Sequence, residues 1–182
     1  MGPFRALGDG PVTPRDWESL DGTLYVDHNS DPWMVFCHEW VQVQNGEICA
    51  VRLNQSVDSA ISEPVVLFRA ADAPWVHPVK GGANFVTDGP FLHQSASGEL
   101  LMLWSSFGQS GYAVGIAKSV SGNILGQWIQ MKEPIFSDDG GHCMLFYTFE
   151  GELLLSIHGP NKLPYERPVF IPAASLLKGI AF

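Results

Sequence analysis

The sequence predicts an all-β protein, and three observations support this fold class. Helical periodicity is nearly absent from the 182 residues. Short apolar runs of β-forming residues are separated instead by Gly, Pro, Asn, Asp and Ser. The chain also contains 19 glycines and 13 prolines, which mark frequent turns. With 46% hydrophobic and 12% aromatic residues, it can bury a substantial core.

The predicted strands form a unit that occurs three times. Each unit has a polar residue beside glycine, an apolar strand, a hairpin turn and a second apolar strand. The paired strands cover residues 20–26 and 33–38, 87–93 and 100–105, and 141–146 and 153–158. A third strand follows in two units, at 47–53 and 112–118, and an outer strand then contains 63–68 or 133–136. Four strands recurring at roughly 50 to 65 residues match β-propeller blades, although the repeat is somewhat longer than the usual ~40 to 50 residues.

We therefore expect about three four-stranded blades within one domain fragment. Residues 17–72 would form the blade that carries Asp21, residues 84–137 the blade that carries Asp88, and residues 138–182 a final blade that carries His142. Residues 1–16 resemble the closing edge of a blade and are expected to be an outer-strand remnant of a preceding one. Three blades and a remnant do not close a ring, so the sequence predicts a partial propeller.

Composition argues against several classes of partner. The net charge of -9, with only 10 Lys and Arg residues, offers no basic stripe for nucleic acid. No apolar run approaches the length of a membrane span. The start lacks a signal-peptide pattern, which favours the cytoplasm unless the start is truncated. Three scattered cysteines fit buried free thiols better than disulfides or a zinc site, and they are Cys37, Cys49 and Cys143.

Polar residues at the blade openings are the candidate site. In a propeller the innermost strand of each blade starts at one rim of the central channel, and the second strand returns to that rim. Two sets of residues should therefore converge: Asp21, Asp88 and His142 from the first strands, and His38, Glu39, Trp40, Phe107 and His158 from the second strands. Carboxylates can protonate or deprotonate groups at a glycosidic bond, and aromatic faces can stack on a sugar ring. A sugar is the predicted ligand.

Each of these residues also has a structural explanation. Aspartate before glycine is a common turn residue, because its side chain bonds its own backbone. A histidine such as His142 can be a structural residue, and Trp40 can belong to the core. Glu39 is harder to explain structurally, because a carboxylate after an apolar strand is costly unless it is paired or exposed to a cleft.

The three blade openings, Leu20-Asp21-Gly22-Thr23, Val86-Thr87-Asp88-Gly89-Pro90 and Gly140-Gly141-His142, resemble those of glycoside hydrolase family 43. The strand Trp33 to Trp40 also resembles the second strand of the blade that bears this family's auxiliary aspartate. The resemblance covers nearly the whole chain. It implies a five-bladed β-propeller that removes arabinofuranosyl, galactofuranosyl or xylosyl units with inversion.

The resemblance also implies roles for particular residues. Asp21 matches the auxiliary aspartate, which orients the general acid and adjusts its pKa. Asp88 matches the general-acid position, where the family commonly has glutamate. His142 matches a histidine near the channel axis that in many members helps to hold calcium or its water. From their place at the rim rather than from the resemblance, we expect four further residues to contact the substrate: His38, Trp40, Phe107 and His158.

Two departures from the family pattern affect this transfer. No segment matches the blade that supplies the general base, which an inverting site needs roughly 6.5 to 9.5 Å from the acid. Asp88 is one methylene shorter than glutamate, which would set its proton donor back by about 1.5 Å. We expect Asp88 to be the acid, with Glu39 as the alternative.

Two other functions fit the same residues. The chain could be a non-catalytic sugar-binding propeller fragment, with Trp40 and Phe107 as stacking platforms. It could also be a truncated product that self-associates through open sheet faces, since uncovered blades expose apolar surface.

Overall fold

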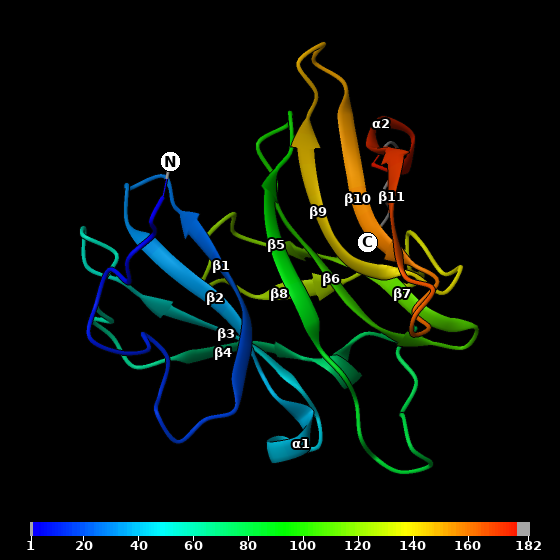
Figure 1. Cartoon of the computed structure of the whole chain (residues 1–182), viewed down its shortest axis with the longest axis horizontal. Helices are drawn as coiled ribbons and strands as arrows, with labels where there is room; N and C mark the ends of the chain where they lie inside the picture. The colour runs from blue at the N-terminus through cyan, green and yellow to red at the C-terminus, as the bar shows by residue number, and fades with distance from the viewer. Residues whose placement is uncertain (1, 178–182) are drawn as a thin grey trace.

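The computed structural model describes residues 2–177, and it consists of three antiparallel sheets packed side by side (Figure 1). The first sheet contains β1 (Ser19–Val26), β2 (Pro32–His38), β3 (Glu47–Arg52) and β4 (Val65–Arg69). The second contains β5 (Asp88–Gln94), β6 (Leu100–Gly108), β7 (Gly111–Ser119) and β8 (Trp128–Gln130). The third contains β9 (Gly141–Tyr147), β10 (Leu153–Gly159) and β11 (Arg167–Pro172). The all-β, partial-propeller prediction is confirmed.

Helices are short and peripheral. They are α1 (Trp40–Val43), the 3₁₀ turn η1 (Ala70–Asp72) and α2 (Ala173–Leu176). Within residues 2–177 there is no helix of the length and apolarity needed to cross a bilayer. The inner strand β5 contacts both β1 and β9, so the first strands of the three sheets come together (Figure 1).

The central sheet shows why its strands are apolar on both faces. Along β6, Leu100, Met102 and Trp104 pack into a cluster shared with the first sheet. The alternate residues Leu101 and Leu103 pack into a second cluster shared with the third sheet. Successive side chains of a strand point to opposite faces, so a blade between two neighbours must be apolar at every position. The continuous run Leu-Leu-Met-Leu-Trp is therefore the sequence pattern of a sandwiched blade.

The three inner strands share one irregularity. Two residues of the inner strand oppose one residue of the second strand between Leu20 and Thr23, between Asp88 and Phe91, and between Gly141 and Met144. The first extra residue of each bulge has a left-handed backbone: Asp21 (φ 58), Gly89 (φ 51) and His142 (φ 53). A bulge bends the strand and redirects its side chains. Asp21, Gly89 and His142 are thus equivalent positions, and Asp88 lies one residue before its own bulge.

One predicted outer strand is wrong. The fourth strand of the second sheet is Trp128–Gln130, not a strand containing residues 133–136. Those residues return to β7 through hydrogen bonds that Ile135 and Phe136 make with Val114, which form an isolated bridge rather than a strand. Pro134 has no N–H to donate, which explains why the regular ladder ends before it.

The sheets lie within the predicted ranges 17–72, 84–137 and 138–182, of which residues 178–182 fall outside the described part. The third sheet has three described strands, and β11 was not predicted. Residues 2–18 contain no strand. Val12 and Trp17 from this segment pack on the outer apolar face of the first sheet, beside Phe36. Whether this segment belongs to a preceding blade stays a prediction.

Candidate functional site

The bulges bring residues of all three inner strands around one cavity. It has a volume of about 310 Å³, and its lining includes Asp21, Gly89 and His142 together with the residues that follow each of them. The carboxylate of Asp21 links the three strands. Its Oδ2 accepts a hydrogen bond from the Gly89 N–H at 3.0 Å, and its Oδ1 lies 3.7 Å from Nε2 of His142. The predicted convergence of the blade openings is therefore present.

Gly89 is needed at this junction for two reasons. Its left-handed backbone is one that L side chains rarely adopt. A Cβ at this position would also lie 3.0 Å from Cδ2 of the His142 ring. The glycine lets the imidazole of one sheet and the carboxylate of another approach the same point of the central strand.

Asp88 faces a different set of groups, because it precedes the bulge. Its Oδ2 accepts a hydrogen bond from the Tyr112 hydroxyl at 2.8 Å. Burial raises the pKa of the Asp88 carboxyl, and the hydrogen bond from Tyr112 opposes this increase. The negative charge of Asp21 raises the pKa further. Asp88 is thus held by its own blade rather than free in the cavity.

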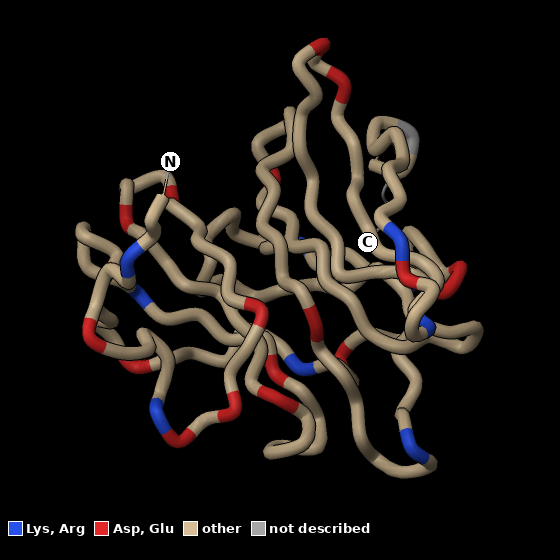
Figure 2. Tube along the Cα trace, in the orientation of Figure 1, with Lys and Arg blue, Asp and Glu red and all other residues tan. Residues whose placement is uncertain are grey.

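Glu39 is the third carboxyl group of the site. It follows β2 and precedes α1, and its N–H bonds the carbonyl of Glu18 at 2.8 Å. Its partial burial, followed by the charges of Asp88 and Asp21, raises the pKa of the Glu39 carboxyl to about 7. No side-chain hydrogen bond of Glu39 occurs among residues 2–177. Figure 2 shows several acidic segments gathered where β1, β5 and the loop after β2 approach one another.

His38 lies beneath this loop rather than at an open surface. Its ring is buried and stacks on Trp17 at 4.0 Å. Its Nδ1 lies 3.0 Å from Glu47 Oε2, and its Nε2 lies 2.8 Å from Gln42 Oε1. Both nitrogens therefore have protein partners, and a direct contact with substrate stays a prediction that this geometry does not favour.

The other predicted substrate residues divide into two groups. Phe107 and His158 flank Tyr112, with ring centroids 5.2 Å and 5.5 Å from its ring. They are therefore next to the group that holds Asp88, and His158 Nε2 also lies 3.0 Å from Asn161 Oδ1. Trp40 begins α1, with Nζ of Lys80 over its ring at 4.8 Å. Their contacts with a sugar remain predictions.

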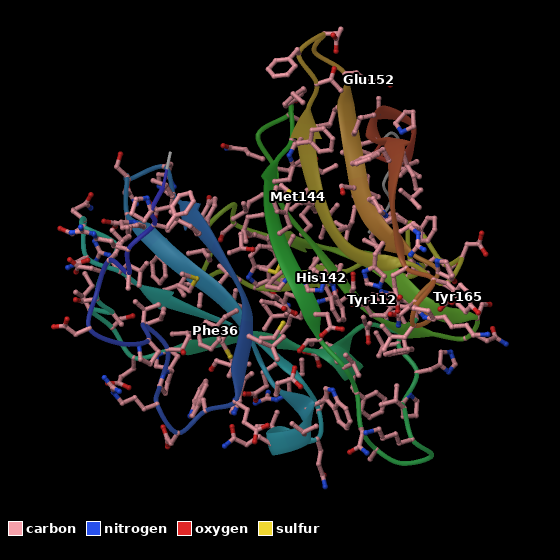
Figure 3. The ribbon with its side chains drawn as sticks, viewed as in Figure 1. Phe36, Tyr112, His142, Met144, Glu152 and Tyr165 are labelled. Carbon is pink, nitrogen blue, oxygen red and sulfur yellow. The ribbon has the colours of Figure 1, made fainter. Side chains whose placement is uncertain are left out.

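Tyr112 was not expected at the site from the sequence, whereas Ser105 lies at the end of a second strand, where the rim was expected. Tyr112 holds Asp88, and Ser105 accepts a hydrogen bond from the His142 N–H at 2.8 Å. Figure 3 shows His142 and Tyr112 close together at the base of β9. The sequence did contain one indication of the role of Tyr112. It is a tyrosine at the start of an apolar strand, where a buried phenol needs a hydrogen-bond partner.

The predicted calcium ion finds little support in the side chains. Among residues 2–177 there is no group of three or more His, Cys, Asp and Glu side chains arranged to hold a metal ion. Calcium prefers several oxygen ligands. His142 offers a nitrogen, and Asp21 Oδ2 already accepts a hydrogen bond from the Gly89 N–H. A calcium site therefore stays a prediction, and no step of the chemistry below depends on it.

Comparison with solved structures gives several relatives of the same fold. An endo-arabinase from Bacteroides thetaiotaomicron VPI-5482 is 44% identical, with a TM-score of 0.88 over 94% of this chain and 61% of that one. An endo-1,4-beta-xylanase from the same organism is 21% identical, with a TM-score of 0.74 over 93% and 58%. An alpha-L-arabinofuranosidase from Lactobacillus brevis is 18% identical, with a TM-score of 0.68 over 90% and 55%. The last two likenesses show the fold alone.

The chain thus spans 55 to 61% of the length of these three structures. No curated protein sequence matches it. The family model for glycosyl hydrolases family 43 matches residues 1–173. Since this match covers nearly the whole chain, and the inner strands converge as the blade openings predicted, the chain belongs to glycosyl hydrolases family 43.

Proposed function

We propose that this chain supplies the proton-donating side of a glycoside hydrolase active site, with Glu39 as the general acid. The substrate class is an arabinofuranosyl, galactofuranosyl or xylosyl linkage. The 44% identical endo-arabinase supports arabinose-containing glycans within that class. The observation that carries the proposal is the Glu39 carboxyl beside Asp21 and Asp88, with its pKa raised to about 7.

A general acid must be protonated at the working pH and able to reach the leaving oxygen. Burial and the nearby carboxylates raise the pKa of Glu39 to about 7, so a large fraction of its carboxyl is protonated at neutral pH. It makes no side-chain hydrogen bond within the described residues, and its reach to the leaving oxygen is part of the proposal. Asp88 is bonded to Tyr112. We therefore favour Glu39 over Asp88, which reverses the order expected from the sequence.

In the proposed reaction, Glu39 transfers its proton to the glycosidic oxygen as the bond from that oxygen to the anomeric carbon breaks. Water adds to the anomeric carbon from the opposite face and gives up a proton to a general base, so the configuration inverts. Burial and the nearby negative charges of Asp88 and Asp21 raise the pKa of Glu39, because both disfavour its ionisation. No residue of this chain is proposed as the general base.

The test compares substrates whose leaving groups differ in their need for protonation. The dinitrophenolate group of dinitrophenyl arabinofuranoside leaves without being protonated. The methoxy group of methyl arabinofuranoside must be protonated by an acid in order to leave. Glu39→Gln should lower kcat/KM for the methyl glycoside by 100-fold or more and spare the dinitrophenyl substrate. Asp88→Asn makes the same carboxyl-to-amide change at the other candidate for the general acid. Both variants are assayed in the chain alone and in a version extended to the length of the relatives.

If Asp88→Asn shows the selective loss and Glu39→Gln does not, the acid assignment is wrong. If arabino-oligosaccharides bind to the extended protein but none is hydrolysed, the chain belongs to a sugar-binding module instead.

Self-association is a second proposal, and exposed apolar side chains on two sheets support it. Leu24 and Val26 on β1 are 51% and 55% exposed. Tyr147 on β9 and Phe170 on β11 are 67% and 56% exposed. These are the surfaces through which a second copy would bind. Sedimentation should then give a mass that rises with concentration, and a monomer at all concentrations would refute it.

A further inference from the structure

Tyr112 lies where the second and third sheets meet at the candidate site, with its hydroxyl bonded within the second sheet and its ring against the third. Tyr112 lies on β7 and is 3% exposed, and its hydroxyl donates to Asp88 Oδ2 at 2.8 Å. Its ring lies between Phe107 and His158, with an interplanar angle of 21° to the His158 ring. The phenol is therefore restrained at both its polar end and its ring.

Neighbouring groups leave Tyr112 little room to move. A Cβ on Gly141 would lie 2.5 Å from the Tyr112 ring, so the ring occupies the space that any other residue at 141 would fill. Ser105 also hydrogen-bonds the Tyr112 hydroxyl, and it accepts the His142 N–H at 2.8 Å. The position of Tyr112 thus depends on backbone from the third sheet as well as on its own sheet.

Tyr112 remains a donor at all ordinary pH values. Burial, followed by the negative charge of Asp88, raises the pKa of its hydroxyl well above the usual range. A donor that cannot ionise stabilises the charged form of the carboxylate that it contacts. This hydrogen bond opposes the effect of burial on Asp88.

We propose that Tyr112 is a positioning residue that orients the Asp88 carboxyl within its own blade and thereby leaves proton donation to Glu39. This inference rests on the proposed function for the role of Glu39 as proton donor. The contacts of Tyr112 with Asp88 do not depend on that function. The titratable groups around the two carboxyls come from several elements: Asp21 from β1, His142 from β9, His158 from β10, and Glu18 and His38 near Glu39.

The experiment replaces Tyr112 with phenylalanine, which keeps the ring and removes the hydroxyl. The carboxyl carbons of Asp88 and Glu39 are titrated by NMR in the wild-type chain, in Tyr112→Phe and in Tyr147→Phe, which changes an exposed tyrosine of β9. Loss of the hydrogen bond should raise the Asp88 midpoint by about one pH unit, a tenfold change in proton affinity. Where Asp88 takes up its proton within the range in which Glu39 titrates, the Glu39 midpoint should fall, because a protonated Asp88 no longer repels its charge. Tyr147→Phe should leave both midpoints in place.

Unchanged midpoints in a folded Tyr112→Phe chain would overturn the inference. If that variant does not fold, Asp88→Asn provides the second test: removing the Asp88 charge must lower the Glu39 midpoint, and a constant midpoint overturns the inference. This readout needs no catalysis, so the two proposals can fail separately. Shifted midpoints without hydrolysis of any glycoside would sink the proposed function alone. Hydrolysis with unchanged midpoints would sink the role of Tyr112 alone.

Discussion

Replacing Glu39 with glutamine should stabilise the protein at high pH and have little effect at low pH. The pKa of Glu39 in the folded chain is about 7, against an ordinary value of 4.5. Below pH 4.5 the carboxyl is protonated in both the folded and the unfolded states. Between pH 4.5 and 7 only the unfolded chain releases the proton, so the free energy of unfolding falls as pH rises, and it levels off above 7.

The size of this effect follows from the same difference in pKa. The full displacement corresponds to ~3 kcal/mol, and solvent screening at a partly exposed carboxyl reduces it to about 1 kcal/mol. Glu39→Gln removes the ionisation and should be more stable than wild type by about 1 kcal/mol at pH 8, which is roughly 2–4 °C in Tm. At pH 4 the two proteins should agree within experimental error.

The assay is urea denaturation at pH 4 and pH 8, with Glu150→Gln as the control. Glu150 lies in the exposed turn between β9 and β10, away from the three carboxyl groups. Its substitution should give no pH-dependent difference. An equal effect of Glu39→Gln at both pH values would refute the argument, because it would show that packing rather than ionisation determines the stability at this position.

Three further predictions concern packing. Gly89→Ala should lower the free energy of unfolding by about 1–3 kcal/mol, because it combines a left-handed backbone with a contact on the His142 ring. Gly98→Ala, with φ 84 and open space around its Cβ, carries only the backbone cost. Thermal melts compare the two variants, and equal losses of stability would exclude the contact with His142. Gly115→Ala should cost about 1–3 kcal/mol, because its Cβ would overlap the Trp75 indole, and a change below 0.5 kcal/mol in urea denaturation would contradict this packing. The three buried thiols, Cys37, Cys49 and Cys143, should resist alkylation in the native state and react after unfolding, as mass spectrometry would show. Burial raises the pKa of each thiol, to about 12 for Cys49 and Cys143. Rapid labelling of the native protein would contradict this burial.

The strand pairs could be predicted because each depends on local chemistry. Apolar runs bounded by turn residues located both strands of all three inner hairpins within a few residues. The run from Leu100 to Trp104 is apolar at every position, which fits a blade that packs against a neighbour on each face. The edge at Trp128–Gln130 could not be located in the same way, because β-propensity alone does not show which of two apolar stretches pairs with β7.

The sequence also identified Asp21, Asp88, Glu39 and His142 as residues that converge. Which groups each side chain faces was not predictable, because it depends on the three bulges. A bulge adds one residue to a strand, and one residue is enough to change the face to which a side chain points. Asp21 and His142 therefore line the cavity, whereas Asp88 turns to Tyr112, which lies 24 residues later in the chain.

By itself, then, the sequence determined the class of fold, the order of its strands and the residues that gather where the blades open. Only the tertiary structure raises the pKa of the Glu39 carboxyl to about 7. This increase arises from burial and from charges on other sheets, and distances across sheets are set by packing rather than by neighbouring residues in the chain.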